Sequence, residues 1–269
     1  MRLSVAIPDS ALSEHSTKLD KSRMVSQMAR CAAVFGVDAI LVYRDGDNVA
    51  DRSLLVATLR YLETPQFLRR SIFPKTANLR FAGALHPLGI PSHDASPDPR
   101  TIQEGEIREG LAVTVRGTRY VDVGIGKLLP LPGRGRDGRV SVRFGSGHPD
   151  PRPAAIPRDQ IPHYWGYAVR ERGSITQTVR EWNGGVIIAT RTGNAATPRR
   201  ISRYVGSDSA TLVVFGSPER DVNEIAGGRL GGRNMIRLNF FPRQRTRTVR
   251  LEEAMLGTLT ILNMGAAAA

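Results

Sequence analysis

Two stretches in which strand and helix patterns alternate, one at each end of the chain, are separated by a stretch with strand patterns only. In the N-terminal stretch, strands are expected at Arg2–Ile7 and Asp38–Tyr43, and helices at Lys18–Phe35 and Val49–Leu62. Apolar residues recur at helical spacing in the helices, and short apolar runs mark the strands. This alternation is typical of an α/β domain with a mostly parallel sheet.

The middle of the chain, residues 94–163, has no helical periodicity. Its strand patterns are Leu111–Val115, Arg119–Val123 and Arg139–Phe144, with a turn region at 128–139. Short strands between Gly- and Pro-rich turns predict a small barrel or sandwich. We therefore expect residues 1–93 and 164–269 to form one α/β domain that is interrupted by a β-rich module at 94–163.

The strand and helix alternation returns after Tyr164. Strands are expected at Tyr164–Arg170, Gly185–Thr190, Ala210–Phe215 and Met235–Asn239, and helices at Ser174–Trp182 and Pro218–Ile225. A last helix opens with Glu252 and Glu253, which complement its dipole. Its apolar residues are Met255, Leu256, Leu259, Ile261 and Leu262. A helix that is apolar on two sides must bury both, either within its own domain or against a second copy of the chain.

The chain is strongly basic, with 38 Lys and Arg against 25 Asp and Glu and a net charge of +13. Such a field favours nucleic acid or an anionic membrane as partner. No apolar run reaches about 18 residues, so no membrane span is predicted, and the N-terminus does not read as a signal peptide. The single cysteine, Cys31, excludes an internal disulfide and any Cys-based zinc site. We expect a soluble cytoplasmic protein without a metal.

The positive charge is densest between residues 229 and 250, where no acidic residue occurs. The arginines of this segment are Arg229, Arg233, Arg237, Arg243, Arg245, Arg247 and Arg250. The planar guanidinium matches the geometry of phosphate groups. The segment therefore predicts a site for a polyanion such as RNA, and a solvated loop is the alternative.

Small or polar residues follow three of the expected strands in the C-terminal half. They occur in the segments 187–193, 213–218 and 239–246. The carboxyl ends of parallel strands meet at one edge of a sheet, where backbone amides can face a ligand. These three segments predict a shared small-molecule pocket, and ordinary connecting loops are the alternative. No phosphate-binding loop, nucleophile elbow or zinc-type histidine spacing is present.

Three blocks of sequence are similar to one enzyme family. They are YLETPQFLRRSIFP with NLRFAGALHPLGIPSH (61–74 and 78–93), YWGYAVR (164–170) and RTRTVRLEEAMLGTLTILN (245–263). They resemble the SPOUT superfamily of S-adenosylmethionine-dependent RNA methyltransferases. More narrowly, they resemble the archaeal and eukaryotic RNA (uridine-N3) methyltransferase family that carries an inserted OB-like domain. The resemblance implies methylation of N3 of a uridine in large-subunit ribosomal RNA.

The same resemblance implies a C-terminal trefoil knot, an OB-like β-barrel for the insert, and a homodimer. It also implies that the three segments with small residues bind the methyl donor. The implied donor-binding residues are Thr190, Gly193, Phe215, Gly216, Ser217, Pro218, Asn239, Gln244, Thr246 and Val249. One departure concerns the last segment, where the family has Gln-Gly and this chain has Gln244-Arg245. Glycine accepts a positive φ that arginine adopts with difficulty, so the local backbone is in question.

Uridine N3 carries a proton at neutral pH, so a base must remove it or the developing anion must be stabilised. We expect Arg250 to stabilise the anion. We expect Glu253, or its neighbour Glu252, to orient Arg250 or to accept the proton, and a role in the helix dipole is the alternative.

We expect phosphate contacts from Arg233, Arg243, Arg245 and Arg247. The leading interpretation is an RNA methyltransferase. The alternatives are a catalytically inert RNA-binding or ribosome-assembly factor on the same fold, which Arg245 would favour, and a protein-interaction scaffold.

Overall fold

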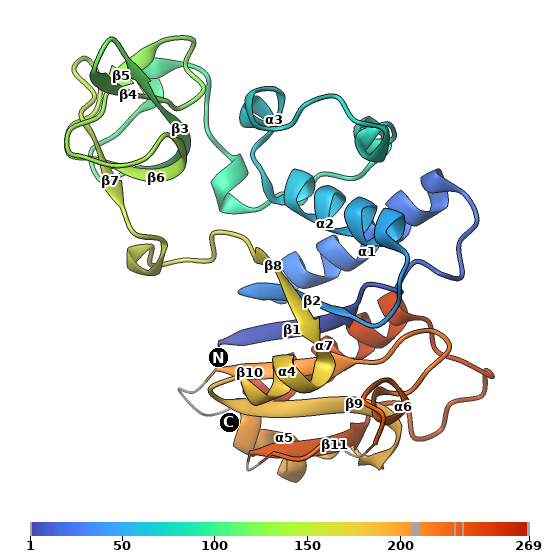
Figure 1. The fold of residues 1–269 in the computed structure, drawn as a ribbon. Helices are drawn as coiled ribbons and strands as arrows, with labels where there is room; N and C mark the ends of the chain where they lie inside the picture. Colours follow the sequence, from blue (N-terminus) through green and yellow to red (C-terminus); the bar gives the residue numbers. More distant parts are fainter. Residues whose placement is uncertain (1, 206–209, 229, 233, 268–269) are drawn as a thin grey trace. The chain divides into compact units, whose positions relative to one another are not determined.

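The computed structural model of the protein describes residues 2–205, 210–228, 230–232 and 234–267, and it divides into two compact units (Figure 1). The first unit contains the described residues of Met1–Glu63, Lys75–Leu88 and Tyr167–Ala269. The second contains Thr64–Pro74 and Gly89–Gly166. The second unit thus includes 64–74, a segment that the sequence pattern groups with the α/β part.

The first unit is built on a six-stranded sheet in the order β11-β9-β10-β1-β2-β8. All neighbouring strands in this sheet pair in parallel. Its strands are β1 (Leu3–Pro8), β2 (Ala39–Arg44), β8 (Ala168–Ser174), β9 (Gly185–Ala195), β10 (Thr211–Phe215) and β11 (Met235–Asn239). The sheet confirms the parallel α/β organisation expected from the alternating strands and helices.

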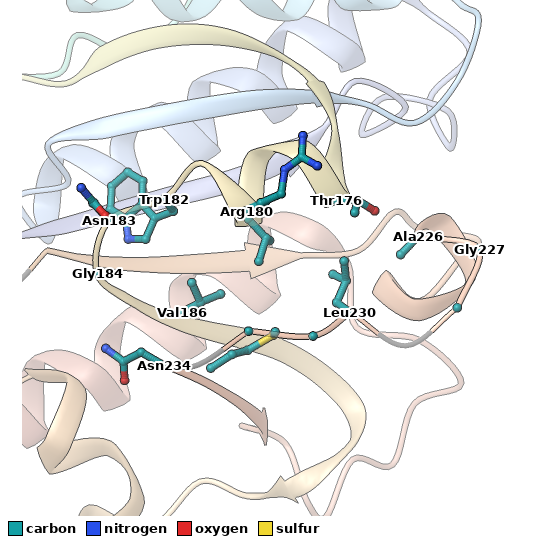
Figure 2. Close-up of a pocket in the computed structure, with 15 residues that line it drawn as sticks. Thr176, Arg180, Trp182, Asn183, Gly184, Val186, Ala226, Gly227, Leu230 and Asn234 are labelled. Carbon is teal, nitrogen blue, oxygen red and sulfur yellow. The ribbon is translucent and has the colours of Figure 1, made fainter.

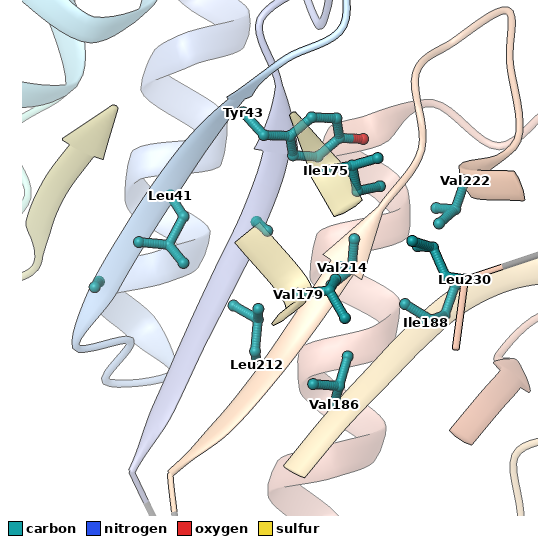
Figure 3. Close-up of a cluster of buried hydrophobic side chains, with 12 residues drawn as sticks. Leu41, Tyr43, Ile175, Val179, Val186, Ile188, Leu212, Val214, Val222 and Leu230 are labelled. Carbon is teal, nitrogen blue, oxygen red and sulfur yellow. The ribbon is translucent and has the colours of Figure 1, made fainter. Parts of the chain in front are cut away.

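Side chains alternate between the two faces of this sheet, so each face has its own apolar layer. On one face, Leu41, Val186 and Val214 pack with Ile175 and Val179 of a short helix, α4 (Ile175–Arg180; Figure 3). Helices α1 (Lys18–Val34) and α7 (Leu251–Ala267) lie on the opposite side of the sheet from α4 (Figure 1).

The helices of this unit are α1 (Lys18–Val34), α2 (Val49–Glu63), α4 (Ile175–Arg180), α5 (Pro198–Val205), α6 (Val222–Ile225) and α7 (Leu251–Ala267). None of the helices described by the structure is long and apolar enough to cross a membrane.

The second unit holds a five-stranded antiparallel sheet in the order β5-β4-β3-β6-β7. Its strands are β3 (Ile107–Val115), β4 (Thr118–Asp122), β5 (Leu128–Pro130), β6 (Gly138–Phe144) and β7 (Pro153–Ile156), and one helix, α3 (Gln66–Ile72), belongs to the same unit. Val121, Val142 and Phe144 are fully buried in its core. The β-rich character expected for residues 94–163 is confirmed. The turn region expected at 128–139 was wrong in part, because β5 and the start of β6 lie within it.

A buried carboxylate, Glu109, ties three parts of this second unit together. It accepts hydrogen bonds from Arg139 (Nε, 2.7 Å), Ser141 (Oγ, 2.7 Å) and Trp165 (Nε1, 2.6 Å). Burial alone raises the pKa of Glu109, but the charge of Arg139 and these hydrogen bonds outweigh it and lower the pKa below 4.5. Glu109 is therefore ionised in the folded unit.

Several element limits differ from the sequence prediction. Helices α3 and α5 were not expected. The strand expected at Tyr164–Arg170 begins later, at Ala168, and the strand expected to end at Thr190 continues to Ala195. Both strands have irregular pairing to a neighbour, and irregular pairing blurs the alternation on which a strand prediction depends.

Candidate functional site

A cavity of about 390 Å³ lies beside a bulge in β9 and the ends of β10 and β11. Three chain segments line it, one within β9, one at the end of β10 and one at the end of β11. They are Ala189–Thr192, then Phe215–Asp221 with Glu224, and then Asn239–Phe241 with Gln244, Arg247–Val249, Leu251, Ala254 and Thr258. The size is within the range of small-molecule sites. The three segments that the sequence analysis placed in one pocket therefore border one cavity.

The first segment is an excursion within β9. The partner of β11 on β9 changes from Ile188, opposite Arg237, to Asn194, opposite Leu238. The intervening residues bulge away from β11, which is how Thr190 reaches the cavity. Gly193 ends the bulge and does not line the cavity; a Cβ there would meet the backbone of Arg237 and Leu238 at 2.8 Å. Its observed role is to let two strands approach closely.

Thr190 joins the first segment to the second. Its hydroxyl donates to Oδ2 of Asp221 at 2.5 Å and accepts from the amide of Thr192 at 3.2 Å. Asp221 also caps helix α6, accepting from the amide of Asn223, while Glu224 accepts from the amide of Asp221. One carboxylate thus fixes both a helix start and a neighbouring cavity wall.

The second segment is a tight turn after β10. The amide of Ser217 donates to the carbonyl of Arg220, and the amide of Arg220 donates to Oγ of Ser217, both at 3.0 Å. Gly216 lies against this turn, since a Cβ at this position would come within 2.8 Å of the Arg220 carbonyl. Phe215 is buried, and Pro218 completes the wall.

An ion pair holds this turn to the end of β2. The Arg220 guanidinium donates to the carboxylate of Asp45, whose side chain is completely buried, and to the Asp45 carbonyl at 2.6 Å. Ser10 donates to the other oxygen of the same carboxylate. The Asp45 and Gly46 amides both donate to Asp9. A buried charge is stable only when its partners surround it, and Asp45 meets that condition through the turn that it anchors.

Tyr43 supports the same turn from below. Its hydroxyl donates to the carbonyl of Phe215 at 2.6 Å. Burial raises the pKa of Tyr43 well above its ordinary value, and the neighbouring carboxylates Asp45 and Asp9 add to the shift. The phenol therefore stays neutral and keeps its proton for this hydrogen bond.

The third segment is folded by its own side chains. Asn239 donates to the carbonyl of Arg191 at 3.0 Å and accepts from the amide of Phe241 at 2.8 Å. Gln244 donates to the carbonyl of Thr246 at 2.9 Å. Val249 lines the cavity, whereas Thr246 does not; its hydroxyl donates to the carbonyl of Thr248.

The two residues expected to act in catalysis stand at the start of α7. The Glu253 carboxylate accepts from the backbone amide of Arg250 at 3.0 Å, which satisfies a donor at the helix start. Among the described residues, no carboxylate forms an ion pair with the exposed Arg250 guanidinium. Glu253 thus fixes the backbone of Arg250 and leaves the guanidinium available to a ligand. Neither residue lines the cavity itself.

Three of the four arginines expected to contact phosphate lie in exposed parts of the same segment. Arg243, Arg245 and Arg247 are all exposed, and Arg247 lines the cavity. Arg233, and Arg229 with it, lie outside the residues that the structure describes. Arg237 belongs to β11 and donates to the carbonyl of Leu230.

Sequence reasoning missed Arg220, Asp221 and Asp45. The spacing of Asp221 and Glu224 is that of a capping box, so this helix start could have been predicted. Nothing in the sequence pairs Asp45 with Arg220, which are 175 positions apart.

A second cavity, of about 670 Å³, lies beside α4, between Trp182 and the described residues 226–228 and 230–232 (Figure 2). None of the described residues assigned to the donor, to catalysis or to RNA lines it. Among the described residues, its lining contains no carboxylate, and Thr176 supplies the one side-chain hydroxyl. The chemistry therefore concentrates in the smaller cavity at the strand ends.

Comparison with known proteins shows the family to which the chain is similar. Residues 2–262 match the sequence profile of a family described as "Putative RNA methyltransferase". The human 28S rRNA (uridine-N(3))-methyltransferase is 30% identical, over 98% of this chain and 78% of the human protein. An uncharacterized protein of Halobacterium salinarum is also 30% identical, over 98% of this chain and 99% of its own length. The mouse 28S rRNA (uridine-N(3))-methyltransferase is 29% identical over 98% of this chain and 76% of the mouse protein.

Proposed function

Because the chain belongs to the "Putative RNA methyltransferase" family, an enzyme family that uses a methyl donor, we propose that it methylates N3 of a uridine in large-subunit ribosomal RNA with S-adenosylmethionine. The observation that carries this proposal is the cavity bordered by three strand-end segments. The sequence pattern predicted a shared small-molecule pocket at those segments, and the family resemblance implied that this pocket binds the donor.

The residues of the cavity fit the chemistry of this donor. Its sulfonium and amino groups are cationic, and the carboxylates of Glu219, Asp221 and Glu224 line the cavity. Its adenine is a flat aromatic ring, and Phe215 and Leu251 provide apolar surface. When bound, the donor supplies an activated methyl group. The protein must then hold the acceptor nitrogen in line with it and exclude water.

Arg250 is proposed to stabilise the negative charge that develops on the uracil ring. A guanidinium beside a carbonyl oxygen favours the anion that forms as N3 loses its proton. Glu253 is proposed as a positioning residue, because its carboxylate holds the Arg250 amide. Arg233, Arg243, Arg245 and Arg247 are proposed to bind RNA phosphates around the target base.

Arg245 does not weigh against activity. In place of glycine, an arginine would strain the backbone only if this position had a positive φ. Among the described residues other than glycine, a positive φ occurs at Arg116 alone, so Arg245 has an ordinary backbone conformation. The inert assembly factor therefore loses the feature that favoured it and remains the second candidate.

Donor binding measured by titration calorimetry tests the proposal. Gly216→Trp should weaken S-adenosylmethionine binding on the order of 100-fold, about 2.7 kcal/mol, because the new ring fills the cavity wall. Gly83→Trp is the matched control, since nothing lies within 4 Å of a Cβ at that position. Equal affinity in both variants, with the fold intact by circular dichroism, would place the donor elsewhere.

Methyl transfer to a ribosomal RNA transcript then separates the enzyme from the inert factor. Wild-type protein should transfer a labelled methyl group to a uridine, and replacement of that uridine by cytidine should abolish labelling at that position. Donor binding without any transfer to large-subunit ribosomal RNA would favour the assembly factor.

The protein is also proposed to be a homodimer. Helix α7 buries Met255, Leu259 and Leu262, yet Leu256 is 53% exposed and Met264 is 67% exposed. Apolar side chains left uncovered on a helix suit a second protein surface. Light scattering at micromolar concentration should give twice the chain mass, and Leu256→Glu should give the monomer mass. A monomeric wild type would remove the proposal.

The finer fold assignments remain part of the same proposal. They are SPOUT superfamily membership, a trefoil knot in the C-terminal part, and an OB-like barrel in the second unit. Their support is the parallel sheet in which β9, β10 and β11 border the cavity, together with the antiparallel five-stranded sheet. An experimental electron-density trace of residues 164–262 checks the threading. The cytoplasmic location expected from the sequence stays a prediction.

A further inference from the structure

In the second unit, arginines that form ion pairs and arginines that do not lie in different places, which a count of charges does not show. Residues 94–163, the larger part of this unit, contain eleven Lys and Arg against nine Asp and Glu, and Arg69 and Arg70 bring the whole unit to thirteen against nine. Four of the arginines form ion pairs with carboxylates of the same unit. These pairs are Arg100–Asp98, Arg108–Glu106, Arg139–Glu109 and Arg152–Asp150. The carboxylates thereby neutralise the arginines near them.

A group of four other arginines lies at one end of the antiparallel sheet. Arg116 lies in the β3–β4 turn and Arg119 at the start of β4, and Arg134 and Arg136 lie in the exposed loop between β5 and β6. None of these four forms an ion pair with any carboxylate that the structure describes. We call these four residues the arginine end of the unit.

The arginine end is held in shape by its own contacts. The Arg119 guanidinium lies against Gly135, where a Cβ would come within 2.7 Å of it, and donates to the carbonyl of Arg136 at 3.4 Å. Asp137 is the acidic residue in this loop, and it accepts from the amide and the hydroxyl of Thr114 at 3.0 and 2.8 Å. The loop is therefore fixed to β3 and β4, and its carboxylate is already engaged.

The β3–β4 turn carries a second, independent sign of function. Arg116 and Gly117 have φ of 49° and 81°, the pattern of a two-residue turn that favours Asn-Gly. An arginine in this conformation costs about 1 kcal/mol relative to the favoured residues. Strained residues of this kind cluster where a side chain is needed for function. Here the side chain adds a cation at the tip of the turn.

We propose that the arginine end of the second unit is a phosphate-binding surface for RNA. This proposal rests on the proposed function and identifies the part of the β-rich unit that binds the RNA substrate. Four unpaired guanidinium groups on a prearranged edge suit the evenly spaced charges of an RNA backbone. Paired arginines elsewhere in the unit already have carboxylate partners and contribute little to this field.

The test compares two double variants with the same change in charge. Arg134→Gln with Arg136→Gln should weaken binding to a large-subunit ribosomal RNA transcript roughly 5- to 25-fold at 0.1 M salt, and should flatten the log–log salt slope by about 0.7 per lost contact. Arg100→Gln with Arg152→Gln should change neither quantity measurably. Equal effects in the two variants would mean that net charge alone matters and would overturn the proposal.

Arg116→Asn separates binding from folding. Asparagine suits the turn, so this variant should be as stable as wild type or more stable, yet bind the transcript several-fold more weakly. Unchanged RNA affinity would remove Arg116 from the surface. RNA binding is measured separately from methyl transfer, so the two proposals can fail independently. If the wild-type protein transferred no methyl group but the arginine variants still bound RNA more weakly, the proposed enzyme would be refuted and the phosphate-binding surface supported.

Discussion

The two units place their functional groups by different means. In the parallel unit all strands run in the same direction, so the bulge near the end of β9 and the segments after β10 and β11 converge on one cavity. In the antiparallel unit the turns lie at both ends of the sheet, and topology favours neither. There, ion pairing leaves one end with unpaired arginines. In the parallel unit the common direction of the strands brings the residues of the site together. In the antiparallel unit ion pairs neutralise arginines elsewhere and leave the arginine end positively charged.

The largest effect that would sharpen this comparison is expected from Arg250→Ala. Turnover at saturating RNA should fall on the order of 100-fold, because the side chain acts on charge that exists only in the transition state. Single-turnover methyl transfer measures this rate. If only the half-saturating RNA concentration rose, Arg250 would be a phosphate contact, and the group that stabilises the uracil anion would lie elsewhere. Arg100→Ala, whose arginine is already paired with Asp98, is the control.

Glu109→Gln should destabilise the antiparallel unit by about 1–3 kcal/mol at neutral pH, because Arg139 loses its buried partner. The pKa of Glu109 is lowered on folding, so its stabilisation is present above about pH 4.5 and is lost as pH falls through the lower folded value. The variant should lose that pH dependence.

Hydrogen exchange of amides in β3 and β6 measures the Glu109→Gln effect, and amides in β1 and β10 are the internal control. Faster exchange in both sheets would show that the two units unfold together, which would break the comparison.

Asp45→Asn should weaken donor binding roughly tenfold, about 1.4 kcal/mol, because the turn at Gly216–Arg220 loses its charged anchor. Asp51→Asn is the matched control, since Asp51 forms a comparably buried ion pair with Lys21, 2.6 Å long, and does not line the donor cavity. Arg220→Lys should restore part of the loss seen in Arg220→Gln. Equal losses from Asp45→Asn and Asp51→Asn would indicate general destabilisation.

The smallest effects should come from Arg243→Ala, Arg245→Ala and Arg247→Ala made one at a time. Each should flatten the slope of log affinity against log salt by about 0.7–0.9 and act alike on many RNA sequences. Fluorescence anisotropy over a salt series measures the slope. If both these variants and the arginine-end variants flatten the salt slope, RNA contacts both units. If only one set flattens the slope, RNA contacts only the unit that carries that set.

The sequence predicts the parallel unit better than the antiparallel one for a physical reason. Buried strands such as Ala210–Phe215 are continuous apolar runs, which are visible without the partner strands. The short β5 contains Pro130 and only one buried residue, Leu129, so its local signal is that of a turn. Its place in the sheet depends on pairing with β4, which no local pattern records.

The candidate site was predictable to the same extent. Small residues after a buried strand are a local feature, so Gly216, Ser217 and Asn239 could be assigned to a pocket from the sequence. The anchor between Asp45 and Arg220 could not, because it depends on how β2 and β10 are placed around β1. Neither could the arginine end, because a count of charges does not show which of them are paired.

The position of β1 has a consequence for synthesis of the protein on the ribosome. This first strand lies in the middle of the sheet, and its residue Leu3 pairs with Thr211. The edge of β1 that pairs with β10 must therefore stay unpaired until most of the chain has been translated. Pairing between such distant segments slows folding. Until then the apolar edge is open to other chains. The nascent chain thus needs shielding for most of its elongation, and truncated products are expected to aggregate.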